Sequence, residues 1–272
     1  MPSLSEALSS FSTVIVTGGS SGIGKSFIEL LGRLNPGLQF CNLSRRQPDI
    51  KISGIKLNHF PCDLSRPAEL ARAAGAVEAF LAQASPAGRI LLINNSGFGA
   101  YGRFPEPSLE HQLELIDVNI RGLVDLTGRL LPLLKARGGA ILNVASTAAF
   151  QPTPFMATYG ASKAFVLHWS LALNEELRGS GVTSRAVCPG PTTTDFSKRA
   201  GLQSGSVSPA LSMTCEQVVM ASLRALAAGR SQVVTGWKNK VMTLVSAKLP
   251  KPLVARAAAR ALGRYQVKQV RR

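Results

Sequence analysis

The amino-acid sequence predicts an α/β fold with a single doubly wound parallel sheet and helices on both of its faces. Short apolar runs alternate with longer stretches of helical periodicity, and this alternation requires right-handed crossovers between parallel strands. The run at 89–94 has an unbroken Ile-Leu-Leu-Ile centre, as expected of a central parallel strand. The chain has 272 residues, of which 45% are hydrophobic, so it can bury a large core.

The elements follow one another in order. A β-branched run predicts the first strand at 12–17, and the helix at 23–34 ends where Asn35-Pro36-Gly37 breaks it. Pro67 favours a helix start, and any break in the helical pattern at 109–135 is expected near Asn119. A mobile loop is predicted at 189–212, which is rich in Pro, Gly, Ser and Thr. The other predicted strands are 38–43, 55–62, 89–94, 140–145, 183–188 and 232–235, and the other helices are 67–84, 157–178 and 216–228.

The turn after the first strand is rich in glycine and reads Thr17-Gly-Gly-Ser-Ser-Gly-Ile-Gly24. Glycines permit a tight turn and let backbone N–H groups approach a pyrophosphate, while the helix N-terminus adds partial positive charge. Such a spacing alone has low specificity, and an ordinary strand-to-helix turn is the alternative. Its place between a predicted strand and a predicted helix favours dinucleotide binding by a Rossmann fold.

The second predicted strand ends in Ser44-Arg45-Arg46, where an NAD site usually has an acidic residue for the ribose 2′-hydroxyl. A hydroxyl and a guanidinium suit a 2′-phosphate instead, because arginine binds phosphate through two parallel hydrogen bonds. The sequence therefore favours NADP(H) over NAD(H). The alternative is that both arginines, Arg46 above all, are solvated loop charges. Asp63 ends the third strand, where it faces the adenine or caps the next helix.

The most informative motif is Tyr159-Gly-Ala-Ser-Lys163, whose end residues share one face of a predicted helix. A lysine ammonium beside a phenol favours the phenolate, so we expect Lys163 to lower the pKa of Tyr159. Such a phenol can exchange a proton with a carbinol oxygen near neutral pH. Ser146 closes the fifth strand and can donate to a carbonyl oxygen. Asn119 lies in an apolar helical run, where it binds water or backbone at a kink or makes a structural hydrogen bond only.

Together these motifs resemble the short-chain dehydrogenase/reductase superfamily over residues 12–235 and, within it, the DltE-like bacterial oxidoreductases. The motifs that carry the resemblance are the glycine turn, Asn94-Asn-Ser-Gly97, Tyr159-x-x-x-Lys163, and Pro189-Gly190 with Thr194. The resemblance implies a catalytic tetrad, with Tyr159 as acid/base and Ser146 orienting the carbonyl. Lys163 would bind the nicotinamide ribose and lower the Tyr159 pKa, and Asn119 would hold a water. The implied cofactor contacts are Gly18, Ser20, Ser21, Ile23, Gly24, Ser44, Arg45, Asp63, Leu64, Asn95, Tyr159, Lys163, Pro189, Thr192 and Thr194.

The resemblance also bears on assembly and on one departure. Many members of the family are dimers or tetramers, so we expect a homodimer or homotetramer that packs through the helices at 109–135 and 157–178. Ser96 stands where the family usually has alanine, which adds a hydroxyl near the cofactor without preventing binding.

These features predict an NADP(H)-dependent oxidoreductase that interconverts a carbonyl and a secondary alcohol. The alternative is an NADP(H)-binding regulatory or scaffold protein without turnover. We expect a Rossmann-fold NADP-binding catalytic domain at 1–235, with a substrate loop near 191–212, and a basic helical C-terminal extension at 236–272. An apolar or aromatic substrate is expected, because the predicted pocket segments contain Phe98, Tyr101, Phe104, Phe150 and Phe155.

Positive charge is concentrated at the end of the chain. The net charge is +16, twelve Lys or Arg lie in 217–272, and no Asp or Glu follows Glu216. A solvated basic tail is the favoured interpretation, with an anionic membrane or an acidic partner as alternatives. Nucleic acid is disfavoured, because Trp237 and Tyr265 are the only aromatic residues of the tail. Two helical patterns occur in this tail. The first comprises Trp237, Val241, Leu244, Val245 and Lys248, and the second places Arg256, Arg260 and Arg264 in one basic stripe. We expect such a surface helix to rest on anionic lipid or to cover an apolar substrate entrance.

Cysteine usage and the chain start indicate a reducing compartment. Cys41, Cys62 and Cys188 fall in apolar strand-like runs and are expected to be buried thiols. No Cys-x-x-Cys pair occurs and no His stands at a zinc-ligand spacing, so no metal site is expected. The chain start has no signal-peptide pattern, and no apolar run approaches membrane-spanning length. We expect a cytoplasmic protein, with peripheral membrane contact through the basic tail as an alternative.

Overall fold

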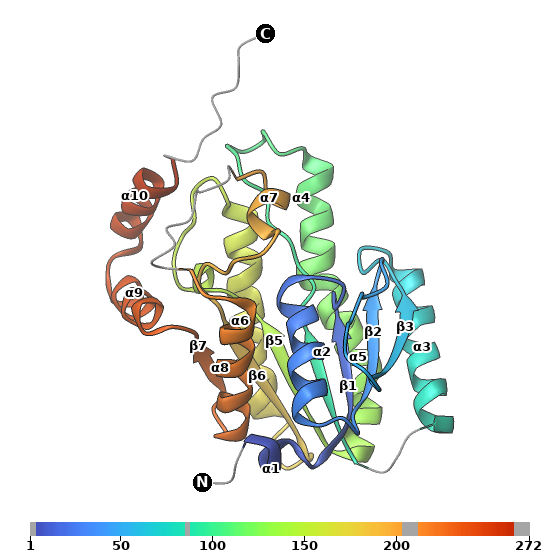
Figure 1. The fold of residues 1–272 in the computed structure, drawn as a ribbon. Helices are drawn as coiled ribbons and strands as arrows, with labels where there is room; N and C mark the ends of the chain where they lie inside the picture. Colours follow the sequence, from blue (N-terminus) through green and yellow to red (C-terminus); the bar gives the residue numbers. More distant parts are fainter. Residues whose placement is uncertain (1–3, 85–87, 203–211, 264–272) are drawn as a thin grey trace.

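A seven-stranded parallel sheet forms the centre of the protein, with the strand order β3-β2-β1-β4-β5-β6-β7 (Figure 1). The computed structural model describes residues 4–84, 88–202 and 212–263. The predicted doubly wound sheet is confirmed, and every predicted strand agrees to within one residue at each end. The strands are β1 (Phe11–Thr17), β2 (Gln39–Ser44), β3 (Lys56–Pro61), β4 (Arg89–Asn94), β5 (Gly139–Val144), β6 (Val182–Cys188) and β7 (Gln232–Val234).

The strand order reverses at β1, which pairs in parallel with both β2 and β4. Val14 lies opposite Phe40 on one side and Leu91 on the other. From β1 the chain builds outward to β3, returns to β4, and then builds outward to β7. In open α/β sheets, ligands bind outside the carboxyl ends of the strands at such a switch point. A ligand site is therefore expected at the residues that follow β1 and β4.

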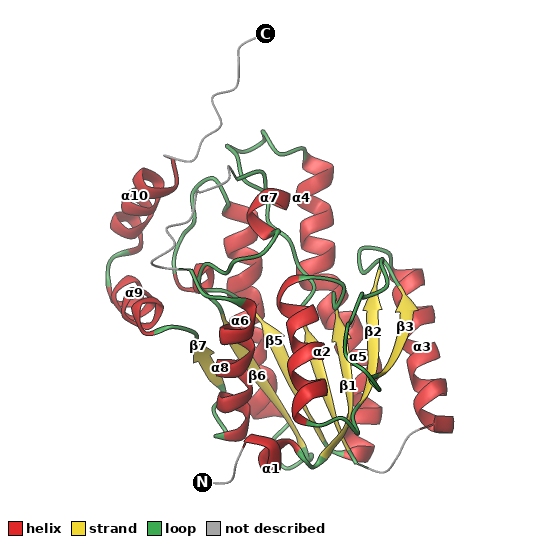
Figure 2. Cartoon of the chain, viewed as in Figure 1, coloured by secondary structure: helices red, strands yellow, loops and turns green. Residues whose placement is uncertain are grey.

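Helices cover both faces of the sheet, as Figure 2 shows. On one face, α2 (Gly22–Leu34) packs against α8 (Cys215–Ala227), and the short α1 (Leu4–Leu8) also contacts α8. The other face carries α3 (Pro67–Ala84), α5 (Gly122–Arg137) and α6 (Ala157–Glu176). Alternate residues of β1 point to opposite faces of the sheet: Val14 and Val16 pack in the hydrophobic cluster on one face, and Ile15 packs in the cluster on the other. This two-sided burial explains the continuous apolar runs of the central strands.

The predicted break near Asn119 is a π-helical turn. The helix α4 (Leu109–Ile116) continues through the turn Asp117–Arg121 into α5, with right-handed helical backbone angles at both junctions. Asn119 lies within that turn and is 1% exposed. Single π turns inside α-helices are frequent at functional sites.

Three short elements were not predicted: α1, the 3₁₀ turn Thr147–Phe150 and α7 (Phe196–Arg199). Each spans five residues or fewer, too few for hydrophobic periodicity to be visible. The helix α7 lies in the segment 189–212 that was predicted to be a loop; residues 203–211 of that segment lie outside the described residues. The two C-terminal helical patterns correspond to α9 (Trp237–Lys248) and α10 (Lys251–Leu262), and Arg264 lies beyond the described residues.

All four cysteines are free thiols, and Cys41, Cys62 and Cys188 are buried as predicted. Burial raises the pKa of Cys41 and of Cys188 to about 12 and that of Cys62 to about 11. Within the described ranges, no group of three or more His, Cys, Asp or Glu side chains is arranged to hold a metal ion. None of the helices in those ranges is long and apolar enough to cross a membrane.

Candidate active site

The glycine turn forms a cradle at the carboxyl end of β1. Gly18 and Gly22 have φ angles of 69° and 57°, in the left-handed region that favours glycine. A Cβ on Gly24 would lie 2.5 Å from the Gly18 carbonyl oxygen and 2.5 Å from the Asn95 side-chain nitrogen. Ser21 precedes α2 and makes no side-chain capping hydrogen bond. The first N–H groups of α2 therefore need another acceptor, and a phosphate suits that position.

Hydrogen bonds fix this turn to the neighbouring strands. The Thr17 Oγ1 accepts from the backbone N–H groups of Asn95 and Ser96, both at 2.9 Å. The Asn95 Nδ2 donates in return to the Thr17 carbonyl at 2.9 Å, and the Gly19 N–H donates to Asn42 Oδ1 at 2.9 Å. The ends of β1, β2 and β4 are thus tied together by hydrogen bonds within the protein.

At the end of β2, the Arg45 side chain is exposed and the Ser44 side chain is buried. The Ser44 hydroxyl accepts from Asn42 Nδ2 at 2.8 Å and donates to the Arg46 carbonyl at 2.6 Å. That hydroxyl is therefore engaged within the protein. The Arg45 side chain is 69% exposed, and its Nη1 lies 3.9 Å from Asp63 Oδ2. Of the predicted pair of 2′-phosphate ligands, the guanidinium is the accessible one.

Asp63 closes this side of the site from the end of β3. Its Oδ1 accepts from the Ser65 backbone N–H at 3.0 Å and from the Ser65 hydroxyl at 2.8 Å. Burial raises the pKa of Asp63, but the two hydrogen bonds from Ser65 and the positive charge of Arg45 outweigh it and hold the pKa below its usual range. Asp63 is therefore a carboxylate that shapes the turn before α3 and stands next to Arg45.

The Asn119 side chain joins three segments. Its Oδ1 accepts from the Phe98 N–H at 3.1 Å, and its Nδ2 donates to the Phe98 carbonyl and to Ser162 Oγ, both at 3.0 Å. A Cβ on Gly97 would lie 3.0 Å from Asn119 Oδ1 and 3.2 Å from Lys163 Nζ. Asn119 and Lys163 therefore border the same stretch of backbone, and glycine at 97 makes room for both.

Lys163 is a buried ammonium bonded to the end of β5. It is 5% exposed, and its Nζ donates to the Val144 carbonyl at 2.7 Å. Burial lowers the pKa of Lys163 to about 8, against a smaller opposing effect of the nearby Cys188. Its Nζ lies 5.9 Å from the centre of the Tyr159 ring. The predicted pair is therefore adjacent on α6, with the lysine anchored to the sheet.

Tyr159 is half-buried as a residue, and its hydroxyl end is surrounded by protein. Burial raises the pKa of Tyr159 to about 12, and a hydrogen bond with the Ser146 side chain opposes that rise. Lys163 was expected to lower this pKa, but burial has the largest effect on it in this structure. The Lys163 ammonium is bonded to the Val144 carbonyl.

A short segment bridges the two halves of the site. The Arg199 Nη2 donates to Ser21 Oγ of the glycine turn at 3.2 Å, and the Phe196 ring lies 5.2 Å from the Tyr159 ring. The Thr194 hydroxyl accepts from the Phe196 N–H at 3.1 Å, which fixes the start of α7. The sequence pointed to Thr192 and Thr194 in this loop but not to Phe196 and Arg199. The only sequence signal for these two residues was that they follow the threonines closely.

The other predicted cofactor contacts surround the same strand ends. The Thr192 hydroxyl donates to Gly190, and the Pro189 carbonyl accepts from the N–H of the residue after Ser146. Ile23 packs against the core, and Leu64 is 8% exposed, so the side chains of both are engaged in packing. Ser20 is half-buried within the glycine turn.

This fold and this site define a doubly wound α/β protein of the dinucleotide-binding oxidoreductase class. A family model described as short chain dehydrogenase matches residues 12–204. The chain belongs to that family. The narrower resemblance to DltE-like oxidoreductases stays a prediction.

Relatives in the curated collections include reductases. The ketoacyl reductase HetN of Nostoc sp. is 33% identical over 192 residues, covering 65% of this chain and 62% of HetN. An uncharacterized oxidoreductase of Staphylococcus epidermidis is 30% identical over 210 residues, covering 72% and 87% of the two chains. A very-long-chain 3-oxoacyl-CoA reductase of Neurospora crassa is 32% identical over 200 residues, covering 68% and 57%. The matches to HetN and to the Neurospora reductase span less than two thirds of their length.

Two solved structures are similar over almost the whole chain. A short chain dehydrogenase from Burkholderia cenocepacia in complex with NADP has a TM-score of 0.74 and 27% identity, covering 90% of this chain and 97% of that one. A short-chain dehydrogenase from Sphingobium yanoikuyae in complex with NADPH has a TM-score of 0.72 and 30% identity, covering 96% and 98%.

Proposed function

We propose that the protein is an NADP(H)-dependent oxidoreductase that interconverts a carbonyl and a secondary alcohol, with Tyr159 as the acid/base. The observation that carries the proposal is the grouping of Tyr159, Lys163, Ser146 and Asn119 at the strand ends beside the glycine cradle. The reductase names of the curated relatives support the reaction type, and the NADP and NADPH complexes of the structural relatives support the coenzyme.

The residues of the site fit NADP(H). A Cβ at Gly24 would press on the Gly18 carbonyl and on Asn95, so glycine there lets α2 pack close to the turn, and the first amides of α2 suit the charge of a pyrophosphate. The exposed guanidinium of Arg45 suits a ribose 2′-phosphate, because β2 itself ends without an acidic residue; a bound phosphate would compete there with Asp63 and Glu114, whose oxygens lie 3.9 and 4.0 Å from Arg45 Nη1. Lys163 and Asn95 are assigned to the nicotinamide half. The chemistry that NADP(H) supplies when bound is hydride transfer at C4 of the nicotinamide ring.

The side chains divide the remaining work between them. In the reductive direction, the Tyr159 hydroxyl gives its proton to the carbonyl oxygen, which becomes the alcohol oxygen. Ser146 donates a hydrogen bond that polarises the same oxygen. Lys163 is the buried cation that stabilises the tyrosinate left behind. Asn119 keeps the backbone beside Lys163 in place and is assigned the water that links the lysine to solvent.

An apolar substrate is supported by a cavity of about 540 Å³ that is lined mainly by residues 100–107 and 154–157, segments expected to build the pocket. Its lining residues do not include Tyr159, Ser146, Lys163 or Asn119, so the cavity is a neighbour of the proposed catalytic group. Its wall is mostly apolar and includes Ala100, Pro107, Phe155 and Ala259, with Arg103 and Gln112 as polar members. The Arg103 guanidinium lies 5.4 Å from the centre of the Phe155 ring. A cavity of this size and lining accommodates an acyl or aromatic carbonyl compound.

The proposal is tested by following NADPH oxidation at the nicotinamide absorbance band with a panel of ketones and 3-oxoacyl thioesters. We expect turnover with at least one apolar carbonyl and a loss of more than about a hundredfold in Tyr159→Phe. Tyr101→Phe is the matched control, because it removes another phenol of the substrate side. Equal rates for the wild type and Tyr159→Phe would refute the assigned role. Tight NADPH binding without turnover across the panel would favour the regulatory alternative.

Assembly, compartment and domain division belong to the same proposal. A homodimer or homotetramer is supported by exposed apolar residues on the predicted contact helices, since Leu109, Leu113, Ile116 and Phe165 are all exposed. Light scattering on the purified protein gives the subunit number. We also propose a cytoplasmic location and a division at residue 236 between the catalytic domain and the basic extension.

A further inference from the structure

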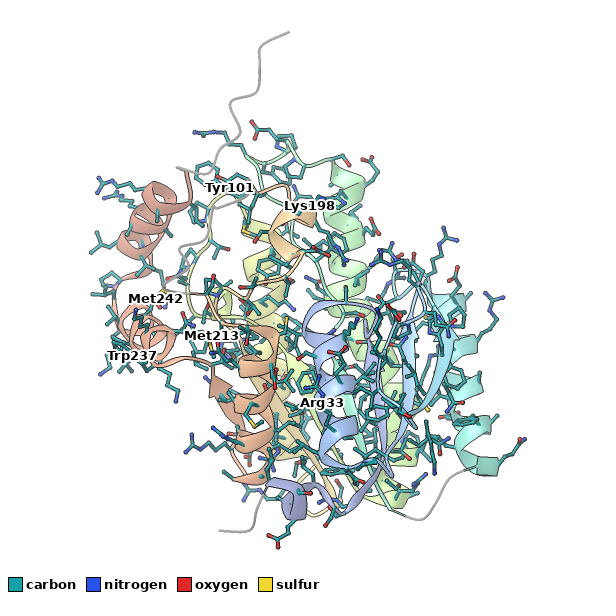
Figure 3. The ribbon with its side chains drawn as sticks, viewed as in Figure 1. Arg33, Tyr101, Lys198, Met213, Trp237 and Met242 are labelled. Atoms are coloured by element: carbon teal, nitrogen blue, oxygen red, sulfur yellow. The ribbon has the colours of Figure 1, made fainter. Side chains whose placement is uncertain are left out.

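Large apolar side chains gather on the outside of the C-terminal helices. Twelve such residues are exposed in the described part of the chain, and seven of them lie between Trp237 and Leu253. Trp237 is 71% exposed and Leu244 is 59% exposed. Figure 3 shows Trp237 and Met242 on α9 at the left edge of the protein, away from the sheet. Apolar side chains clustered on a surface indicate an interaction site.

The helix α9 buries polar residues and exposes apolar ones, the reverse of an ordinary surface helix. Its buried residues are Asn239, Thr243 and Ser246, each 6% exposed or less. Their polar groups are satisfied locally, because Asn239 Nδ2 donates to the Thr235 carbonyl at 2.9 Å, and the Thr243 and Ser246 hydroxyls donate to carbonyls of α9 itself. A helix on a soluble surface normally buries its apolar stripe. Here the packed face is polar, which leaves the apolar face for something outside the protein.

The outward stripe has the arrangement of a helix that lies in a membrane interface. Four exposed apolar residues of α9, Trp237, Val241, Leu244 and Val245, form this stripe. At about 100° of rotation per residue, they lie within about 100° of one another around the helix axis, on the side opposite the buried polar residues. Lys238 and Lys240 flank the stripe on its two sides, and Lys248 ends it. Lysine stems in such positions extend along an apolar layer and place their charges among headgroups.

We propose that α9 is a membrane-contact helix that lies flat on an anionic lipid surface, with its apolar stripe below the headgroups. The neighbouring α10 adds Leu253, Arg256 and Arg260, all of them exposed. No Asp or Glu occurs anywhere after Glu216, so the charge of this surface is wholly positive. An anionic bilayer satisfies the apolar stripe and the positive flanks together.

A second copy of the chain fits this surface less well. Pairing two such faces would bring the lysines and arginines of one against those of the other, with no carboxylate in the segment to offset them. The surface also lies beside the proposed substrate cavity. Ala259 of α10 lines the cavity, and the Tyr101 hydroxyl donates to the Leu262 carbonyl at 2.6 Å. Contact with lipid would therefore bring the cavity close to a source of apolar molecules.

The test is co-sedimentation of the full chain with vesicles of phosphatidylcholine alone or with phosphatidylglycerol added. We expect the wild type to bind the anionic vesicles and to be released by salt. Trp237→Ser with Leu244→Ser should lower the partition coefficient by more than about tenfold. Leu113→Ser removes an exposed apolar side chain from the proposed subunit contact on α4; compared at the same oligomer mass by light scattering, it should leave the partition coefficient unchanged.

Charge is tested separately. Lys240→Gln with Lys248→Gln should lower binding to anionic vesicles about fivefold per lysine, because each basic residue near the surface contributes on the order of 1 kcal/mol. Lys51→Gln with Lys135→Gln removes the same charge from other exposed surfaces and should have no effect.

Three results would overturn the proposal. They are no sedimentation of the wild type with anionic vesicles, equal sedimentation of the wild type and the Trp237/Leu244 variant, and a fall in oligomer mass of that variant by light scattering, which would assign the stripe to a second copy. Unchanged thermal unfolding and NADPH affinity of each variant show that the fold is intact. Because none of these readouts requires turnover, their outcome is independent of the proposed reaction.

Discussion

Replacing Asn119 with alanine tests whether the π turn is held by the side chain that interrupts the helix. The change removes hydrogen bonds to the Phe98 N–H, the Phe98 carbonyl and the Ser162 hydroxyl. At about 1 kcal/mol net for each, with Phe98 only partly buried, the expected loss of unfolding free energy is about 3 kcal/mol. For a chain of this size, that corresponds to a fall in Tm of about 6–9 °C.

The assay is differential scanning calorimetry of the wild type, Asn119→Ala and a control. Asn58→Ala is the matched control, because Asn58 makes one long bond, 3.5 Å to the Phe40 carbonyl. We expect its Tm to fall by less than about 2 °C. If both variants lost the same amount, the three-way bridge at Asn119 would contribute nothing special and the reasoning would be wrong. Turnover should also fall in Asn119→Ala, since the backbone next to Lys163 is released.

Three further predictions concern the cradle and the buried lysine. In Gly24→Ala, the new Cβ would lie 2.5 Å from the Gly18 carbonyl oxygen, so NADPH affinity by fluorescence titration should fall more than about tenfold, and unchanged affinity would contradict the cradle. In Arg45→Ala, NADPH affinity should fall about tenfold while NADH affinity stays the same, because a largely solvated phosphate contact is lost; equal losses would refute 2′-phosphate binding. The pKa of Lys163 is about 8 in the folded protein against 10.5 when free, so between these values the unfolded chain binds more protons and the contribution of Lys163 to stability rises with pH. Urea unfolding across this window should show the wild type gaining stability relative to Lys163→Met, a comparison that cancels the titrating cysteines, and a flat difference would show that Lys163 does not titrate as a buried group.

Much of the fold was predictable because burial on both faces leaves a direct mark on sequence. The strand β4 at the centre of the sheet has only apolar residues between its ends, and β1 and β5 have apolar runs of at least three residues. Asn119 signalled the π turn, because a polar amide in an apolar helix needs a special partner. Tyr159 and Lys163 were recognisable because a spacing of four residues fixes their relation on a helix, whatever surrounds them.

The interactions of the site side chains depend on the direction of each side chain, which spacing along the sequence does not give. The pKa of Tyr159 depends on where the Lys163 ammonium points, and it is bonded to the Val144 carbonyl. The Ser44 hydroxyl is bonded to Asn42 and Arg46 inside the protein, and its place among the cofactor contacts stays a prediction.

Long-range packing set the other limits. Phe196 and Arg199 acquire their roles only when a loop folds across the site. The helical spacing of the C-terminal segment could be seen in the sequence. That α9 packs its polar face against the protein could not be predicted, because periodicity does not show which face of a helix contacts the protein.

The buried thiols give the folded protein a built-in unfolding reporter. Alkylating reagents attack thiolates, and burial raises the pKa of all four cysteines, but three of them are also inaccessible whereas Cys215 is partly exposed. A native sample should therefore take up one equivalent of iodoacetamide at a measurable rate, and the other three only as molecules open. Mass spectrometry of the labelled chain then counts opening events without any added probe, and the same count serves every variant that keeps its four cysteines.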